Sequence, residues 1–273
     1  MRQALQLGEE QRFDEMATML AEVLQDEPDE PYILGWLAVA ERELGNDGAA
    51  YEYFKRCIAA EPLDPQLLAL AGSGLAAFDD PDAEATLRAA ALIGPELAIT
   101  RLQYGAYLAR EGMFGEALEQ LEAAARIEPE DPVVHGELGI AHALKGDLQT
   151  AAASMERAIA LAEDDSWTRV LHGLVLSELD QYEEAAEQLV RAASERPQDA
   201  EAQVLAALAA AAVGWDDAAQ DALARAEFAE EGADPALLTE TEERLAVGAE
   251  AAAALLRDTV GPSVLHDRLT HPL

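Results

Sequence analysis

The sequence repeats itself at an interval of 34 residues, and this interval constrains the fold more than any other feature. Alanine recurs at that interval, with a single step of 33, at Ala50, Ala83, Ala117, Ala151, Ala185 and Ala219. Met16 extends the column backward by a further 34 residues. A period of this length indicates supersecondary units that bury their apolar faces by stacking on one another, and the sequence therefore predicts a solenoid.

Three further columns keep the same interval. One is large and apolar: Leu20, Phe54, Leu87, Leu121, Met155, Leu189 and Leu223. A second is mostly small: Val23, Cys57, Ala90, Ala124, Ala158, Ala192 and Ala226. A third is mostly proline: Pro28, Pro62, Pro95, Pro129, Glu163, Pro197 and Glu231. Because the single cysteine, Cys57, stands in the small column, we expect a buried and unreactive thiol.

Each period reads as two short helices. In residues 133–162, apolar or small side chains first follow a helical spacing up to Leu144, and Gly146 and Asp147 then interrupt it. Leu148, Ala151, Met155 and other residues continue with spacings of three and four, as one face of a second helix requires. A turn this short makes the two helices antiparallel. With aromatic residues at only 5% and no alternating β pattern, the sequence predicts an all-α fold.

These units resemble the tetratricopeptide repeat. The best match has Tyr104, Gly105, Leu108, Gly112, Phe114, Ala117, Leu121, Ala124 and Pro129 at the positions that the family conserves. The unit that ends at Pro197 follows the same pattern, although His172 stands where the family prefers leucine. The resemblance covers about residues 1 to 231. It implies a right-handed superhelical solenoid of antiparallel helix pairs, with about 6.5 repeats and a C-terminal capping helix.

The columns define the expected boundaries. We expect a solenoid over residues 1–256, with repeats at 1–28, 29–62, 63–95, 96–129, 130–163, 164–197 and 198–231, a capping helix at 235–256 and a tail at 257–273. The first repeat has almost no first helix, since only Met1 to Leu7 precede its turn, and it reads as a frayed half-repeat. The third repeat is one residue short and lacks glycine at its turn, so we expect an altered turn at Phe78–Pro81.

The chain is strongly acidic, with 54 acidic and 18 basic residues and a net charge of −36. The phosphates of nucleic acids and anionic membrane surfaces are poor partners for such a surface. Two explanations of the acidity stay open: solubility or adaptation to high salt, and a basic partner. The N-terminal residues lack the apolar core of a signal peptide, and no apolar run is long enough to span a membrane, so we expect a cytoplasmic protein.

The resemblance implies that the first helix of each pair lines a concave wall. By helical phase the candidate groove residues are Tyr32, Trp36, Val39, Leu68, Leu102, Ile140, Trp167, Val170, Leu174, Val204 and Leu208. None is lysine or asparagine, the residues with which grooves of this family hold the terminal carboxylate of chaperone peptides. An apolar wall favours an apolar or amphipathic helical segment as ligand. The alternative is that tight winding of the solenoid buries these residues.

The C-terminal tail differs from the rest of the chain. Residues 257–273 carry two acids and two arginines, so the net charge lies in residues 1–256. The candidate contact residues of this tail are Val264, Leu265, Leu269 and Leu273. Two interpretations stay open: a disordered terminus, and a segment that occupies an apolar groove of its own chain or of a second copy.

Residues for catalysis, metal binding or cofactor binding do not stand out. His135, His142 and His172 lie on first helices, but they lack a nearby cysteine or a third and fourth ligand in the usual zinc spacing. No phosphate-binding glycine loop or nucleophile motif is present in the sequence. We therefore expect neither a cofactor nor an enzymatic activity.

Three functional hypotheses remain. The first is a scaffold or adaptor that binds an apolar or amphipathic peptide segment of a partner protein in its groove, with a basic partner favoured if the acidity serves recognition. The second is a self-assembling structural protein whose groove or tail mediates homo-oligomerisation. The third is an accessory chaperone for an exposed apolar helix.

Overall fold

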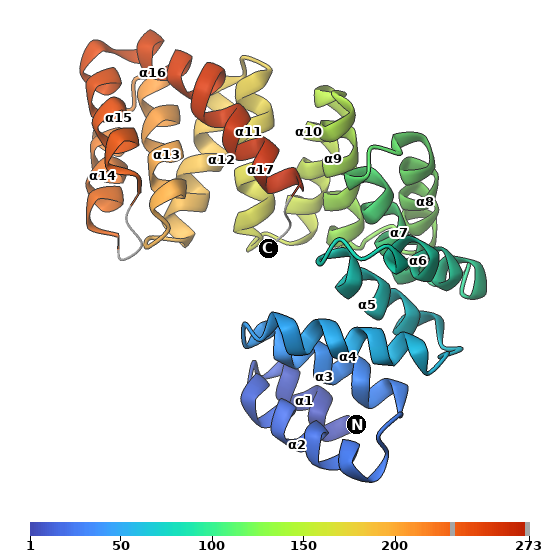
Figure 1. Ribbon diagram of the computed structural model, residues 1–273. Helices are drawn as coiled ribbons and strands as arrows, with labels where there is room; N and C mark the ends of the chain where they lie inside the picture. Colours follow the sequence, from blue (N-terminus) through green and yellow to red (C-terminus); the bar gives the residue numbers. More distant parts are fainter. Residues whose placement is uncertain (230–232, 271–273) are drawn as a thin grey trace. The chain divides into compact units, whose positions relative to one another are not determined.

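The computed structural model describes residues 1–229 and 233–270, and all regular secondary structure in these ranges is helical (Figure 1). The chain forms two compact units, Met1–Pro129 and Glu130–Leu273, which we call the N-terminal unit and the C-terminal unit. Both are built from antiparallel helix pairs, as the 34-residue columns predict. The described part of the chain is thus an all-α solenoid of antiparallel helix pairs.

The N-terminal unit contains four helix pairs. They are α1 (Arg2–Glu9) with α2 (Phe13–Asp26), α3 (Pro31–Glu43) with α4 (Asp47–Ala59), α5 (Pro65–Ala76) with α6 (Asp82–Ile93), and α7 (Ala98–Arg110) with α8 (Phe114–Ile127). Helix α1 corrects the expectation of a frayed first repeat. It is short, but it completes two turns and buries Ala4 and Leu7 against α2.

The C-terminal unit continues the pattern and then adds a different ending. Its pairs are α9 (Pro132–Lys145) with α10 (Leu148–Leu161), α11 (Ser166–Glu178) with α12 (Tyr182–Glu195), and α13 (Ala200–Ala212) with α14 (Asp216–Phe228). The ending consists of α15 (Pro235–Val247), α16 (Ala249–Leu255), a π-helical turn η1 (Leu256–Val260) and α17 (Gly261–Thr270). Glu231 of the proline column lies outside the described residues.

The capping helix expected at 235–256 is in fact two helices. Gly248 separates α15 from α16 with φ 127° and ψ −177°, a backbone conformation that only glycine adopts readily. The chain turns there, and α16 packs against both α15 and α13. The described part of the expected tail, up to Thr270, likewise continues as η1 and α17, which pack on α11 within the C-terminal unit.

Every helix pair turns through one residue in the left-handed backbone conformation. These residues recur at the repeat interval with φ between 52° and 85°: Gln11, Gly45, Asp79, Gly112, Gly146, Asp180 and Gly214. The residue that follows each of them donates its backbone N–H to the carbonyl five residues earlier, at 2.8 to 3.2 Å. This bond closes the first helix in the Schellman manner.

The third repeat keeps the left-handed residue of this turn, so the expected alteration is confined to the residues that follow it. Asp79 takes the left-handed position that glycine holds in other repeats, and aspartate tolerates it better than most residues do. The missing residue falls just afterwards. Only three residues separate Asp79 from Ala83, whereas four separate Gly45 from Ala50. The step of 33 is therefore a shortened entry into α6.

Gln11 is the least suited residue in this left-handed column, because its longer side chain gives no local compensation. We expect Gln11→Gly to raise the free energy of unfolding by about 0.5 kcal/mol, since the relief of strain exceeds the added entropy of the unfolded chain. Gly112→Gln is the converse change and should cost about 1 kcal/mol. An added Cβ at Gly112 meets no atom within 4 Å, so only the backbone conformation is tested. Urea denaturation of both variants checks the signs; equal signs would contradict this account.

Some of the acidic residues have a structural role at the start of the first helices. Glu30, Asp64, Asp131, Asp165 and Asp199 recur at the repeat interval, and each side chain accepts a hydrogen bond from a backbone N–H of the first turn that follows. Such caps stabilise a helix by about 1 kcal/mol each. Helix capping therefore accounts for these five acidic residues, and neither solubility nor a basic partner is needed to explain their presence.

The alanine column, the large apolar column and most of the small column form the core. All residues of the large apolar column are buried, and glycines on the first helices allow their close approach. A Cβ added at Gly105, Gly139 or Gly173 would lie 2.6 to 2.7 Å from the Cγ atom of Leu121, Met155 or Leu189, respectively. Cys57 is buried, as expected, and burial raises the pKa of its thiol to about 12. The thiol is therefore protonated at neutral pH.

Candidate protein-binding surface

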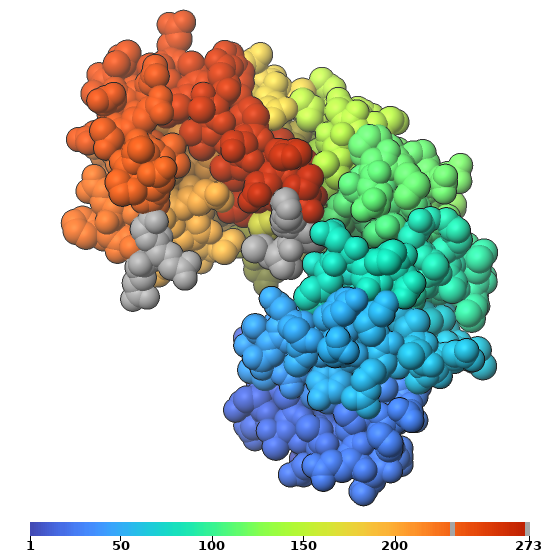
Figure 2. Space-filling view, in the orientation of Figure 1, coloured from blue at the N-terminus to red at the C-terminus, as the bar shows by residue number. Residues whose placement is uncertain are grey.

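The first helices of the C-terminal unit form an apolar face that the end of the same chain covers. The face comprises Trp167, Val170 and Leu174 on α11 and Val204 and Leu208 on α13. We call it the α11–α13 face. Helix α17 packs on α11, η1 contacts both helices, and α16 packs on α13. In Figure 1 α17 crosses α11, and in Figure 2 the red C-terminal segment forms a continuous ridge over this unit.

The contact between the face and the segment is a shared hydrophobic core. Val170, Leu174, Val204 and Leu208 are 0% exposed. They belong to one cluster with Leu255, Leu256, Val260, Leu265 and Leu269 of the C-terminal segment. Trp167 packs against the same cluster and is half-buried. This part of the predicted groove is therefore filled, not open.

An arginine of α17 completes the contact at the edge of the face. The guanidinium carbon of Arg268 lies 4.8 Å from the centre of the Trp167 ring. The Nε atom of Arg268 donates a hydrogen bond of 2.9 Å to a carboxylate oxygen of Glu201. Trp167 and Glu201 are 34 residues apart, and each is the second residue of its helix. Two consecutive repeats thus hold one cation, by stacking and by charge.

The predicted tail residues divide between the two sides of α17. Leu265 and Leu269 are buried against the face, Val264 is half-buried, and Leu273 lies outside the described residues. Ser263, His266 and Asp267 are exposed. Helix α17 is therefore amphipathic, with its apolar side on the solenoid.

The start of α17 requires glycine. The N–H of Gly261 donates to the carbonyl of Leu256, which closes the π-helical turn. A Cβ at Gly261 would lie 2.4 Å from that carbonyl oxygen. Pro262 follows without a backbone N–H. This junction sets the direction in which α17 leaves η1.

Ile140 is the predicted groove residue on α9. It is buried and belongs to the same core as the α11–α13 face. Val133, which also lies on α9, is exposed. The C-terminal segment and the neighbouring repeats thus bury six of the predicted groove residues wholly or in part: Ile140, Trp167, Val170, Leu174, Val204 and Leu208.

On α3 of the N-terminal unit, the predicted groove residues are exposed in part, and Trp36 and Val39 also pack against the core of that unit. Tyr32 is 40% exposed, and Trp36 and Val39 are partly exposed. The hydroxyl of Tyr32 donates a hydrogen bond to the carboxylate of Asp64, and this bond raises the pKa of Tyr32. Tyr32 also borders an apolar hollow of about 290 Å³ with Met19 and Val23. We call Tyr32, Trp36 and Val39 the α3 face.

Leu68 and Leu102 do not extend this accessible face. Both are buried, and Leu68 clusters with Ala69 and with Ala90 of α6. The assignment of Leu68 to an open groove is therefore wrong. The reason is helical phase: its side chain points into the helix pair, so the α5 residues that face away from α6 are different ones.

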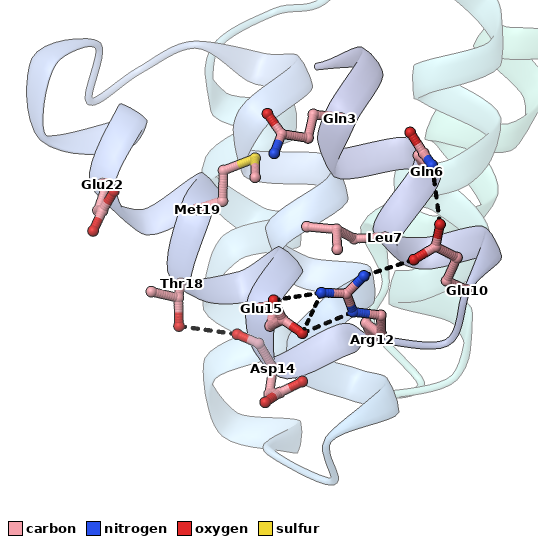
Figure 3. Close-up of a pocket in the computed structure, with 10 residues that line it drawn as sticks. All are labelled: Gln3, Gln6, Leu7, Glu10, Arg12, Asp14, Glu15, Thr18, Met19 and Glu22. Carbon is pink, nitrogen blue, oxygen red and sulfur yellow. Dashed lines mark hydrogen bonds and ion pairs between the residues drawn. The ribbon is translucent and has the colours of Figure 1, made fainter.

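A second hollow in the N-terminal unit is polar and already neutralised. It measures about 420 Å³ and lies between α1 and α2. Figure 3 shows Arg12 between Glu10 and Glu15, and both carboxylates lie 2.7 Å from the guanidinium. The hydrogen bond from Arg12 lowers the pKa of Glu10. The single cation of this hollow is thus satisfied by its own neighbours, and the hollow offers little to a ligand.

Among the described residues of the C-terminal unit, His172 is the buried histidine. His172 on α11 borders a hollow of about 570 Å³ between α10 and α12, together with Glu156, Glu184 and Glu187. Burial, and then the nearby cation of Arg169, lower the pKa of His172 to about 4. The imidazole is therefore neutral at pH 7. In the described residues no three histidine, cysteine or carboxylate side chains come close enough to hold a metal ion.

The lowered pKa of His172 links stability to pH. Between pH 6.5 and pH 4 the unfolded histidine binds a proton that the folded one does not, so this group makes the fold less stable as pH falls. We expect a loss of about 2 to 3 kcal/mol across that window. His172→Leu should remove this contribution, because leucine binds no proton in either state. Urea denaturation from pH 7 to pH 4 checks it, with exposed His266→Ala as control; parallel curves for all three proteins would refute it.

No helix in the described part of the chain is long and apolar enough to cross a membrane.

Comparisons with known proteins support the fold. No family model and no curated protein matches the sequence. The structure is similar to a chain of the APC/C hetero-tetramer Cut9-Hcn1, with a TM-score of 0.71 and 17% identity over 89% of this chain and 48% of that one. The present chain thus spans about half the length of that relative.

Two shorter proteins are also similar. The widely conserved type IV pilus biogenesis factor PilW has a TM-score of 0.62 and 20% identity, over 72% of this chain and 91% of its own. TTC0263, a thermophilic TPR protein of Thermus thermophilus, has a TM-score of 0.53 and 26% identity, over 64% of this chain and 96% of its own. With the repeat columns and the helix pairs, these likenesses show that the chain is, by its fold, a tetratricopeptide repeat protein.

Proposed function

We propose that the protein is an interaction scaffold whose first-helix faces bind amphipathic helical segments of partner proteins. The observation that carries this proposal is the docking of α17 on the α11–α13 face, where an amphipathic helix buries two leucines and pairs one arginine. A surface that holds such a helix within the chain has the shape and polarity to hold one from another protein.

The α3 face of the N-terminal unit is the accessible surface of this kind. Its two aromatic side chains, Tyr32 and Trp36, are residue types that supply much of the binding energy in protein interfaces. Glu27 and Glu30 lie at the adjacent apolar hollow. With a net charge of −36, the chain attracts basic partners and repels acidic ones. A helix with one apolar side and one or more arginines or lysines is therefore the proposed ligand.

Photo-crosslinking in the native cell tests this function. A photo-reactive phenylalanine analogue in place of Trp36 should crosslink to a specific polypeptide, and mapping of the crosslink should locate it to an amphipathic basic helix. The same analogue in place of Leu92, an exposed residue of α6, is the matched control and should give no such product. Tyr32→Ala in the crosslinking protein should reduce the yield about tenfold, because an aromatic anchor is lost. Equal crosslinking from both positions would contradict the proposal.

A further inference from the structure

We propose that α17 is an internal ligand of the α11–α13 face, and that an arginine-bearing amphipathic helix of a partner protein binds this face in its place. The inference rests on the proposed function. It adds which residues a ligand helix has to present, and how α17 regulates binding. Helix α17 would then close a second binding surface of the scaffold until a competing helix displaces it.

Helix α17 contacts the solenoid in the way that a bound helical peptide would. Its apolar side, with Leu265 and Leu269, is buried on the face, while Ser263, His266 and Asp267 on the other side face solvent. A helix of a repeat pair packs along an antiparallel partner, as α13 does on α14, whereas α17 packs mainly on α11 and on the adjoining turn η1. Helix α17 has one contact surface only, so the replacement of α17 by another amphipathic helix leaves the helix pairs intact.

The face selects for arginine. Arg268 is the cation that stacks on Trp167 and pairs with Glu201, and its side chain is largely buried there. The planar guanidinium suits stacking and pairing at once, whereas the ammonium of lysine suits only pairing. A competing helix is therefore expected to present two leucines four residues apart, as Leu265 and Leu269 are, with arginine directly before the second.

The covalent connection of α17 to the solenoid through η1 sets how strongly α17 competes with a helix from another protein. A short connection holds a ligand at an effective concentration of about 1 mM. If the untethered helix binds with a Kd of about 10 µM, the tethered copy lowers the apparent affinity for a competitor by about 100-fold. The ion pairs of Arg257 with Asp180 and Asp258 on the preceding turn are exposed, so they add little and weaken with salt. The closed state is thus favoured but reversible.

Peptide binding to full-length variants tests the inference. The probe is a fluorescent synthetic peptide of residues 257–273, measured by anisotropy. Two variants open the face: Leu265→Asp with Leu269→Asp, which removes the apolar contact, and the milder Arg268→Glu, which places a carboxylate against Glu201. Both should bind the peptide at least about 50-fold more tightly than the unmodified protein does. His266→Ala, on the exposed side of α17, is the matched control and should behave as the unmodified protein.

The sequence of the peptide tests the selection for arginine. A peptide with Arg268→Ala should bind the opened variants about tenfold more weakly, and one with Arg268→Lys should fall between. Equal affinity of all three peptides would overturn the role of Trp167 and Glu201. Circular dichroism confirms that each variant is folded, and the Arg268→Glu variant keeps the test valid if the double aspartate variant is not.

The remaining outcomes separate this inference from the proposed function. Opened variants that are folded but do not bind the peptide would overturn the α11–α13 face as a helix-binding site, while crosslinking from the α3 face would still support the scaffold. Equal binding by opened and unmodified proteins would overturn closure by α17. Light scattering that shows a dimer of the unmodified protein, with α17 exchanged between copies, would also overturn it, because a second copy would then be the occupant.

Discussion

Replacing Gly74 with alanine is expected to lower the free energy of unfolding by about 3 to 4 kcal/mol, at the upper end of the cost of overpacking a core. Gly74 lies on α5, and the ring of Phe54 from α4 packs directly on it. An added Cβ would lie 2.3 to 2.6 Å from three ring atoms. Phe54 is fully buried, so its ring has little space into which to move.

The large apolar column explains why glycine is needed at this position. Most repeats carry leucine where the second repeat carries Phe54, and the residues equivalent to Gly74 in the other repeats, such as Ala141 and Val175, have a Cβ. The larger ring and the missing Cβ therefore compensate for each other. Phe54→Leu alone should cost about 1 to 2 kcal/mol through the cavity that it leaves.

A double-mutant cycle tests this compensation. In the presence of Phe54→Leu, Gly74→Ala should cost at least about 2 kcal/mol less than it does alone, because the ring atoms that it strikes are gone. The fluorescence of Trp36, the single tryptophan of residues 1–129, reports the urea transition of the N-terminal unit. Gly48→Ala is the control: an added Cβ there meets no atom within 4 Å, and alanine in a helix should stabilise by up to about 1 kcal/mol. Additive costs at residues 54 and 74 would contradict the compensation.

The repeat interval was sufficient to predict the helix pairs and the core. A structurally equivalent position is visible in the sequence only when the repeats place the same residue type there, as they do in the buried alanine column. Glycine at single turns, such as Gly146, indicates the left-handed conformation, but the position does not stand out as a column of like residues. Glycine, aspartate and glutamine all occupy that column, so it has a common backbone conformation but no common side chain.

The surface of α11 and α13 could be predicted only in part. Helical phase placed Val170, Leu174, Val204 and Leu208 on one face, because adjacent first helices present equivalent positions. What covers that face depends on contacts between segments that lie far apart in the chain, such as those of α11 and α17, and periodicity carries no information about them. The break at Gly248 was missed because one glycine in an alanine-rich stretch does not reveal whether the helix bends or ends there.

A polar column was also missed, and it carries the largest buried side chain. Arg101, Arg169 and Gln203 lie at the repeat interval, and each donates a hydrogen bond to a carbonyl of the preceding inter-repeat turn: that of Pro95, Glu163 and Arg196, respectively. Arg101 and Arg169 also donate to the side chains of Gln120 and Gln188. The bonds to the carbonyls join the first helix of a repeat to the end of the preceding repeat, and the bonds to Gln120 and Gln188 join the two helices of one pair. Different residue types serve here, since the requirement is a long side chain with an N–H donor.

Arg169 is the member of this column whose removal should cost most. It is 2% exposed, and its guanidinium also lies 3.7 Å from the carboxylate of Glu195. Arg169→Ala should lower the free energy of unfolding by about 4 kcal/mol, because it leaves a cavity and deprives the acceptors on Glu163 and Gln188 of their donor. Arg169→Gln should recover part of this loss, because Gln203 makes the equivalent bond in the next repeat.

Urea denaturation of the three proteins checks this order, and Arg191→Ala is the matched control. Arg191 also pairs with Glu195, at 3.3 Å, but its side chain is half-exposed, so its loss should cost no more than about 0.5 kcal/mol.

A second measurement separates the effect of the charge of Arg169 from that of its packing. The cation of Arg169 helps to lower the pKa of His172, so the pKa measured by NMR should rise in Arg169→Gln, which keeps a polar side chain at this position without the charge. An unchanged pKa would show that burial alone keeps His172 neutral, and equal costs for Arg169→Ala and Arg191→Ala would refute the role of the buried arginine.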